Sequence, residues 1–346
     1  MDSPDDPAER APVVPPATRP GGAPRIRRHR GRVTRADFEA QVQATRADLT
    51  AQVRATRASL EATNDRINAR TGRNLLFAVS VGLLLGGVVL VSLVVVKELF
   101  VLIAMALIAF TAYELATALR QAGRRVPRVG SVVAVVAYLP LTYLWRPDGQ
   151  WLGLLGTMAG LALWRVVEQA VPARRTSSRA LAGDIGSSLF LLAYVGLLGS
   201  FAVLLTAEDG GEWWTLAFLI LVVCCDTGAY AAGLNFGKHP MAPTISPKKT
   251  WEGFAGAAVA AVLAGVLVAE FMIHQPWWFG VVMGLVIVVT ATMGDLAESL
   301  MKRDLGVKDI SSWLPGHGGF LDRLDSILPS AAVAYALFLI VQGVPS

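Results

Sequence analysis

Four carboxylates near the end of the sequence are spaced as a metal site would require. Asp295 and Glu298 are three positions apart, as are Asp322 and Asp325, so each pair would share one face of a helix. Each pair lies at an end of an apolar segment, where a carboxylate is costly unless it is paired or binds a metal ion. Hard oxygen donors, with no cysteine nearby, suit Mg²⁺ rather than zinc. The pattern therefore predicts a magnesium site.

A glycine-rich segment, Pro315–Gly319, lies between these pairs and is flanked by basic side chains. It could bend tightly and bring backbone N–H groups close to a phosphate. A glycine-rich loop is a weak signal alone, and His317 within it could equally bond only to backbone. Its basic neighbours favour a cradle for a metal-bound polyphosphate. These neighbours are Lys302, Arg303, Lys308 and Arg323.

A second polar cluster begins with Asp226, which lies deep in an apolar segment and would be costly there without a partner. The loop that follows offers small residues, hydroxyls and ammonium groups able to meet phosphate oxygens. They are Gly233, Gly237, Lys238, Ser246, Lys248, Lys249 and Thr250. An ordinary basic loop would account for the lysines but not for Asp226. Among the other charges in apolar segments, Arg165 and Glu168 are spaced to form a structural pair, whereas the role of Glu114 stays open.

The elements that must position these residues are membrane-spanning helices. The chain has 346 residues, of which 54% are hydrophobic and 16% charged, and its mean hydropathy is +0.51. Such a composition requires lipid as the solvent for much of the chain. We expect an all-α polytopic membrane protein with about nine spans, each long enough to cross a hydrocarbon core. They lie near 75–96, 98–118, 129–145, 151–171, 187–206, 213–233, 252–273, 277–297 and 326–343.

Charges in the loops predict the orientation, because cytoplasmic loops carry an excess of Lys and Arg. With the N-terminal tail cytoplasmic, the outside loops hold little beyond Lys97, Arg146 and the acidic segment 207–212. Both polar loops, 234–251 and 298–325, then face the cytoplasm, where nucleotides are found. Because basic clusters of this kind mark membrane topology, we expect no nucleic-acid partner. The predicted location is the plasma (inner) membrane.

Two segments precede the first span. Residues 1–33 are rich in Pro, Arg and Gly and predict a disordered basic tail. Residues 34–72 contain an eleven-residue repeat that begins TRADFEAQVQA, and this period keeps a thin apolar stripe in line along a helix. We expect this amphipathic helix to self-associate or to lie on the membrane surface. The transmembrane domain would then occupy 75–346.

The run from Ser299 to Asp325 resembles the signature of phosphatidate cytidylyltransferases, or CDP-diacylglycerol synthases. The matching positions are Ser299, Lys302, Arg303, Lys308, Asp309, Pro315, His317, Gly318, Gly319, Asp322, Arg323 and Asp325. Ser246–Thr250, followed by Glu252 and Gly253, is similar to the upstream motif of the family. The resemblance covers roughly 75–346, so it leaves the repeat helix without an assigned role.

The resemblance implies a helical enzyme, usually a homodimer, that condenses CTP with phosphatidate to give CDP-diacylglycerol and pyrophosphate for phospholipid biosynthesis. It also implies dependence on Mg²⁺, with a monovalent cation such as K⁺ beside it. By motif, Asp295 and Asp322 correspond to the metal ligands of the family, and Asp325 and Asp226 are further candidates. We expect catalytic roles for Lys302, Arg303, Lys308, His317 and Arg323, and substrate binding by Lys238, Ser246, Lys248, Lys249, Thr250, Gly318 and Gly319.

Two other functions are compatible with parts of the pattern. A related membrane enzyme could use CTP on another lipid, as an archaeal-type lipid cytidylyltransferase or a polyprenol kinase does, and a kinase would release CDP without pyrophosphate. Intramembrane carboxylates also occur in transporters, but a transporter should show paired interrupted spans in two related halves. Here the polar motifs gather in two loops of the C-terminal half, which favours an enzyme.

Overall fold

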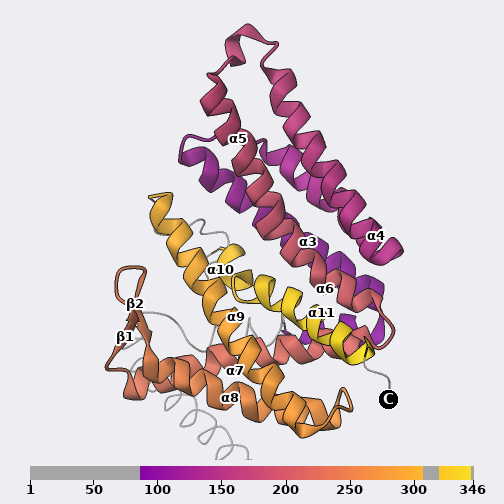
Figure 1. Ribbon diagram of the computed structural model, residues 1–346, viewed down its shortest axis with the longest axis vertical. Coiled ribbons are helices and arrows are strands. Elements are labelled where there is room, and N and C mark those ends of the chain that lie inside the picture. Colours follow the sequence, from indigo (N-terminus) through magenta and orange to yellow (C-terminus); the bar gives the residue numbers. More distant parts are fainter. Residues whose placement is uncertain (1–85, 307–318, 344–346) are drawn as a thin grey trace, which may run out of the picture. The chain divides into compact units, whose positions relative to one another are not determined.

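The computed structural model describes residues 86–306 and 319–343, which belong to one compact unit of the chain. Figure 1 shows that this part of the chain is almost entirely helical, which confirms the all-α class. Its first helix is Gly86–Val95. The elements that follow are α3 (Lys97–Gln121), α4 (Arg128–Glu168), the 3₁₀ turn η1 (Pro172–Arg174), α5 (Ser178–Leu191), the π-helical turn η2 (Leu192–Leu197), α6 (Leu198–Ala207), α7 (Gly211–Phe236), β1 (Pro240–Ala242), β2 (Ser246–Thr250), α8 (Trp251–Phe271), α9 (Trp277–Asp304), α10 (Leu321–Leu324) and α11 (Ile327–Gly343). The tail expected at 1–33 and the repeat helix expected at 34–72 lie outside the described residues.

Seven helices in the described ranges are long and apolar enough to cross a membrane, with α5, η2 and α6 counted as one and α10 and α11 as another. One of the seven, α4, is broken at Arg146, whose φ is 52°. The space between Gly153 and the Tyr138 side chain is too small for even a Cβ atom, so the two arms of α4 fold back on each other. These arms match the spans expected at 129–145 and 151–171. The count of nine stays a prediction, since the span expected at 75–96 is described only in part.

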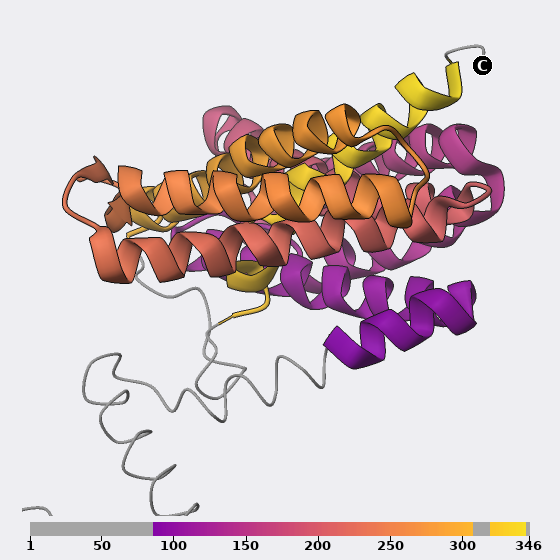
Figure 2. The ribbon, with the colours of Figure 1, turned by 90° about the horizontal axis from the view of Figure 1, so that it is seen from below.

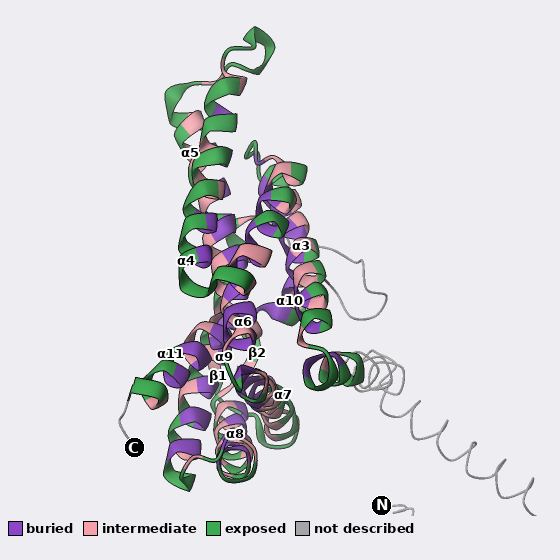
Figure 3. Ribbon diagram, turned by 90° about the vertical axis from the view of Figure 1, so that its right-hand side faces the viewer, coloured by how far each residue is buried: buried purple, intermediate pink, exposed green. Residues whose placement is uncertain are grey.

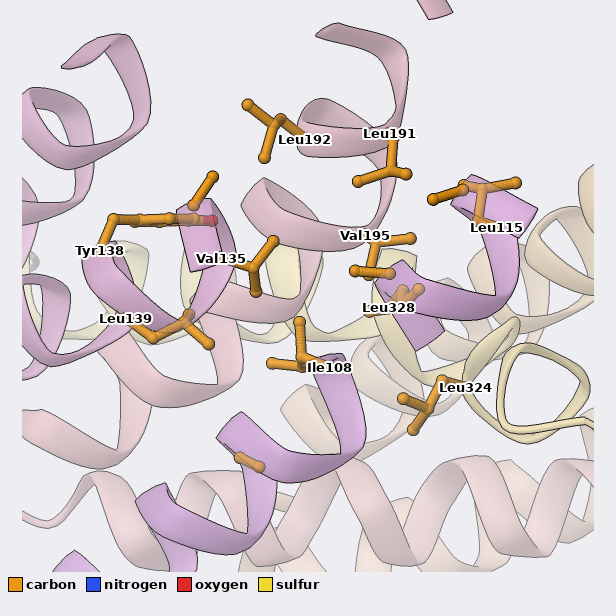
Figure 4. Close-up of a cluster of buried hydrophobic side chains, with 14 of the residues drawn as sticks. Ile108, Leu115, Val135, Tyr138, Leu139, Leu191, Leu192, Val195, Leu324 and Leu328 are labelled. Atoms are coloured by element: carbon orange, nitrogen blue, oxygen red, sulfur yellow. The ribbon is translucent and has the colours of Figure 1, made fainter. Parts of the chain in front are cut away.

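A hydrophobic core joins the N-terminal helices to the C-terminal segment. Figure 4 shows Ile108 and Leu115 of α3 and Val195 of η2 in the same cluster as Leu324 and Leu328. All five side chains are at most 8% exposed. Burial of apolar side chains on this scale is the main force that holds such elements together. Helix α3 therefore packs directly on the segment that carries the second carboxylate pair.

Helices α7, α8 and α9 pack against one another in sequence order, as Figures 1 and 2 show. Glycines permit their close approach. A side chain on Gly228 of α7 would overlap the Gly256 backbone of α8, and one on Gly265 of α8 would overlap Gly280 of α9. Small residues at helix interfaces are the usual means of close packing in membranes. This packing brings the ends of the three helices that adjoin the polar loops to one region.

Apolar side chains cover much of the outer surface of the helices. On α8, Val259, Leu263 and Leu267 recur every four residues and are 58–62% exposed. Figure 3 shows exposed positions continuing along the outer sides of the other helices. Such stripes would be unfavourable in water and are typical of helices that face lipid. The chain is accordingly a multi-pass membrane protein.

Ion pairs join the loops that the charge pattern places outside. Lys97 Nζ lies 2.6 Å from Glu212 Oε2, and Arg146 Nη1 lies 3.1 Å from Glu208 Oε2. Three loops that are separate in the sequence thus meet at the same end of the bundle. Helices that cross a membrane in alternating directions would place these three connections on the same side.

The buried Arg165 joins the second arm of α4 to α5. Its side chain is 1% exposed, pairs with Glu168 and lies 2.6 Å from Asp184 Oδ2. Asp184 also accepts a hydrogen bond from the Arg125 backbone N–H at 2.8 Å. The expected pair of Arg165 and Glu168 is confirmed, and Asp184 extends it into a network that satisfies a charge buried away from water.

A short β hairpin, predicted only as a loop, lies between α7 and α8. Its strands are antiparallel, with Pro240 opposite Thr250 and Ala242 opposite Ser246. Thr250 ends β2 and caps α8, since its Oγ1 accepts the Gly253 N–H at 3.1 Å. The hairpin therefore delivers its polar side chains directly to the start of α8.

Candidate active site

A cavity of about 390 Å³ brings together the two polar clusters of the sequence. Its walls come from α7, both strands of the hairpin, α8, α9 and the α10–α11 segment. The charged and hydroxyl-bearing side chains among its lining residues are Asp226, Tyr230, Lys248, Lys249, Thr250, Thr292, Asp295, Asp322, Arg323, Asp325 and Ser326. All four carboxylates proposed as metal ligands are in this set. The packing of α7, α8 and α9 explains how Asp226 comes to share a cavity with residues far along the chain.

Gly294 allows α9 to approach the segment that follows α10. A Cβ atom on Gly294 would overlap the backbone carbonyl oxygen of Asp325 and would lie 2.7 Å from Pro329 Cγ. Any other residue would therefore push α9 away from this segment. The lack of a side chain at Gly294 thus allows the carboxylates of Asp295 and Asp325 to reach the same cavity.

Lys249 of β2 pairs with Asp295 of α9. Its Nζ lies 2.5 Å from Asp295 Oδ2, and the two side chains are 20% and 37% exposed. An ion pair of partly buried groups is screened less by solvent than one on the open surface. The pair therefore ties the hairpin to α9 at the wall of the cavity.

Lys302 is not part of the cavity lining and lies between two carboxylates. Its Nζ is 2.7 Å from Glu298 Oε1 and 2.6 Å from Asp322 Oδ1. The other oxygen of Asp322 accepts the Gly319 backbone N–H at 3.1 Å. These contacts orient Asp322 from two sides, with one side chain from α9 and one backbone group from the segment before α10.

Polar contacts also fix the base and the turn of the hairpin. At its base, Glu252 Oε2 accepts the backbone N–H groups of Lys238 and His239 at 3.1 and 3.2 Å, and His239 Nδ1 lies 2.5 Å from Glu252 Oε1. At its turn, Arg303 Nε donates to the Ile245 carbonyl oxygen at 2.6 Å. The hairpin is thus anchored to α8 and to the end of α9, which sets where its lysines reach the cavity.

The predicted site residues fall into three groups. The cavity wall includes Asp226, Lys248, Lys249, Thr250, Asp295, Asp322, Arg323 and Asp325. Outside that lining lie Lys238, Ser246, Lys302, Arg303 and Gly319, of which the last three hold neighbouring parts of the site in place. Lys308, His317 and Gly318 lie outside the described residues.

Glu298, which its spacing from Asp295 placed in the predicted metal site, lies outside the cavity lining, whereas Ser326 lines the cavity although no sequence pattern singled it out. Glu298 is 2% exposed and holds Lys302, while Ser326 lines the cavity. The pairing of Glu298 with Lys302 could be predicted, because side chains four positions apart on a helix can contact each other. Ser326 follows Asp325 without any distinctive pattern, so its place depends on the fold.

The donor set fits a hard divalent cation. Within residues 86–306 and 319–343, no three Asp, Glu, His or Cys side chains lie close enough together to hold a metal ion in this arrangement. However, four carboxylates line one cavity, and the ammonium groups of Lys249 and Lys302 lie against two of them, Asp295 and Asp322. A positive charge is therefore already stabilised at both positions, and carboxylate oxygens are the ligands that Mg²⁺ prefers.

The charges of the lining suit a polyphosphate that arrives with a cation. Four carboxylates face three cationic side chains, those of Lys248, Lys249 and Arg323. A bare polyphosphate would meet net repulsion from such a wall. A polyphosphate that carries a divalent cation would satisfy the carboxylates through the metal and the cationic side chains through its oxygens.

Comparison with known proteins supports the same chemistry. A family model described as "Cytidylyltransferase family" matches residues 77–341. The chain is 39% identical over 280 residues to the phosphatidate cytidylyltransferase of Mycobacterium leprae, which covers 79% of this chain and 90% of that protein. It is 38% identical over 278 residues to the protein of the same name from Mycobacterium tuberculosis, covering 79% and 85%. With that of Brucella suis it is 41% identical over 145 residues, or 42% and 54% of the two chains.

Proposed function

The chain belongs to the cytidylyltransferase family, and we propose that it transfers a cytidylyl group from CTP to phosphatidate, giving CDP-diacylglycerol and pyrophosphate. The observation that carries this proposal is the cavity in which the carboxylates and cationic side chains of two distant polar clusters meet. The similarity to proteins named phosphatidate cytidylyltransferase over most of both chains supports the choice of lipid.

In this reaction a phosphate oxygen of phosphatidate forms a bond to the α-phosphorus of CTP. The bond from the α-phosphorus to its bridging oxygen breaks, and pyrophosphate leaves with that oxygen. A phosphomonoester is already anionic near neutral pH, so the site need not supply a general base. It must instead hold two anions together and align them in line, which is mainly a matter of positioning and electrostatic stabilisation.

We assign the cationic side chains at the cavity to the phosphates. Lys248, Lys249 and Arg323 are the ones that line it, so they are placed to hold CTP or the lipid phosphate. Asp295 and Asp322 would hold Mg²⁺, with Asp226 and Asp325 as further ligands and a monovalent cation such as K⁺ nearby. Mg²⁺ bound there would neutralise the phosphates of CTP and the leaving pyrophosphate. Lys302 acts through Asp322, which it orients.

We further propose that the protein is a homodimer of the plasma membrane whose polar loops face the cytoplasm. Support for the orientation comes from the pairing of Lys97 and Arg146 with the acidic segment 207–212, which gathers the poorly basic loops at one end. We also propose that the protein has no nucleic-acid partner, because basic clusters in the loops of a membrane protein mark its topology.

The proposed reaction can be tested with the purified full chain in detergent micelles that contain phosphatidate. With CTP labelled at the α-phosphate, we expect the label in a chloroform-soluble product and one pyrophosphate for each product molecule. Polyprenol and another lipid phosphate in place of phosphatidate test the alternative substrates. Transfer of label from γ-labelled CTP to a lipid, with release of CDP, would identify a kinase and contradict the proposal.

A further inference from the structure

Glu114 is a buried carboxylate that the reaction described above does not use. It lies on α3, is 1% exposed, and is absent from the lining of the cavity. Its Oε2 accepts the backbone N–H of Leu321 at 2.9 Å. Leu321 is the first residue of α10, and Asp322 is the next. A carboxylate buried inside a membrane protein is costly, so its contact with this position calls for a reason.

The contact gives the backbone N–H of Leu321 a hydrogen-bond acceptor. The first N–H groups of a helix have no partner within the helix. Leu321 is 0% exposed, so water does not reach it. The carboxylate also lies at the start of the apolar helical stretch Leu321–Gly343, where a negative charge is favourable. Glu114 therefore fixes the position of the Leu321 backbone.

A second contact from α3 holds the preceding residue. Phe110, one helical turn before Glu114, stacks on Phe320 with ring centroids 4.9 Å apart and an interplanar angle of 14°. Such stacking adds to the free energy of burial. Two consecutive residues, Phe320 and Leu321, are thus held by neighbouring turns of the same helix.

The hydrophobic core holds the other side of the same segment. Leu324 and Leu328 lie in the cluster with Ile108 and Leu115 of α3, as Figure 4 shows. Helix α3 therefore contacts the chain both before and after Asp322 and Arg323, which line the cavity. The side chains of α3 touch this segment without entering the cavity.

We propose that Glu114 is a positioning residue, which sets where Asp322 and Arg323 enter the cavity by fixing the backbone of Leu321. This inference rests on the proposed function. It means that α3 affects the reaction indirectly, although the described residues that line the cavity all belong to α7 or later elements. Small displacements of a reacting group reduce rates strongly, so loss of the contact is expected to act on turnover.

The test compares three variants of the full chain, purified in detergent. Glu114→Met keeps the size of the side chain but removes the acceptor, and we expect kcat to fall about 30- to 100-fold. Glu114→Gln keeps an acceptor and should remain within about fivefold of the wild type. Thr111→Val is the matched control, because Thr111 is equally buried on α3 and its Oγ1 donates to the Leu107 carbonyl oxygen of the same helix. It should leave kcat unchanged.

Two further measurements separate positioning from a general loss of structure. A merely structural role would lower the melting temperature and the yield of folded protein, but would leave kcat per folded enzyme and the Mg²⁺ concentration for half-maximal activity unchanged. For Glu114→Met we expect kcat per folded enzyme to fall and the half-maximal Mg²⁺ concentration to rise, whatever the change in melting temperature, and we expect Glu114→Gln to restore both values. Wild-type kcat in folded Glu114→Met would overturn the inference.

Phe110→Leu provides an independent test if Glu114→Met does not fold. It removes the stacked ring but keeps an apolar side chain, and we expect kcat to fall about three- to tenfold. An unchanged kcat in this variant, at unchanged melting temperature, would also overturn the inference. A wild-type protein that makes no CDP-diacylglycerol would contradict the proposed function instead.

Discussion

Lys249 of the β hairpin and Asp295 of α9 form an ion pair of 2.5 Å at the wall of the cavity. They come from the two polar clusters of the sequence, and the whole of α8 separates them along the chain. Their contact depends on two local features. Thr250 caps α8 directly after Lys249. Close packing of α8 on α9 then brings the start of α8 near the part of α9 that carries Asp295. The pair thus joins the two clusters into one site.

Replacing Lys249 by Met should lower kcat/KM for CTP by about 100-fold. The change removes a cation from the lining and leaves the charge of Asp295 without its partner, so an incoming polyphosphate meets stronger repulsion. Initial rates at varied CTP concentration measure the effect. Lys97→Met is the control, because Lys97, at the start of α3, pairs with Glu212 near the start of α7, and neither residue lines the cavity. Equal losses in the two variants would show that charge at the cavity is not the cause.

Replacing Gly294 by Ala should abolish most activity by separating α9 from the segment after α10. The added methyl group would overlap the Asp325 carbonyl oxygen, which belongs to the backbone and has little room to move. Gly186→Ala is the matched control, since nothing lies within 4 Å of a Cβ atom at that helical position. We expect Gly186→Ala to keep full activity. A fully active Gly294→Ala would mean that this approach of the helices is not needed.

Much of the fold could be predicted from the sequence, because long apolar segments in a membrane have few alternatives to helices. The break at Arg146 also lies between two expected spans. The β hairpin was missed, since its strands are short and polar and resemble a loop. The pairing of Arg165 with Glu168 was predicted from local spacing, but its extension to Asp184 depends on how α4 and α5 pack.

The candidate site was predictable to the extent that local patterns describe it. Charge and spacing selected the side chains that line the cavity, including Asp226 and Lys249. The same signals also selected Arg303, which contacts the hairpin turn outside the cavity lining. The role inferred for Glu114 depends on contact between α3 and the segment before Asp322, residues far apart in the sequence. No periodicity or local motif reports such a contact.

Replacing Asp184 by Ala should destabilise the protein by about 3 kcal/mol, because it leaves the buried Arg165 with only one of its two carboxylate partners. The change also removes the acceptor of the Arg125 N–H. Thermal melting of the purified protein in detergent measures the effect. Asp209→Asn is the control, since Asp209 pairs with Arg146 at 3.7 Å on the open surface and should not alter melting. Equal melting of both variants would contradict the importance of the buried network.

Removing divalent cations with EDTA should abolish cytidylyl transfer, and added Mg²⁺ should restore it. The reason is the charge of the cavity, where four carboxylates face three cationic side chains and a bare polyphosphate would be repelled.

Asp322→Asn should remain inactive at any Mg²⁺ concentration while the protein stays in the membrane, because the variant loses a proposed ligand. Release of labelled pyrophosphate and membrane content of the protein are the two measurements. Full activity in excess EDTA, or near-normal activity of Asp322→Asn, would show that these carboxylates do not hold a required metal ion.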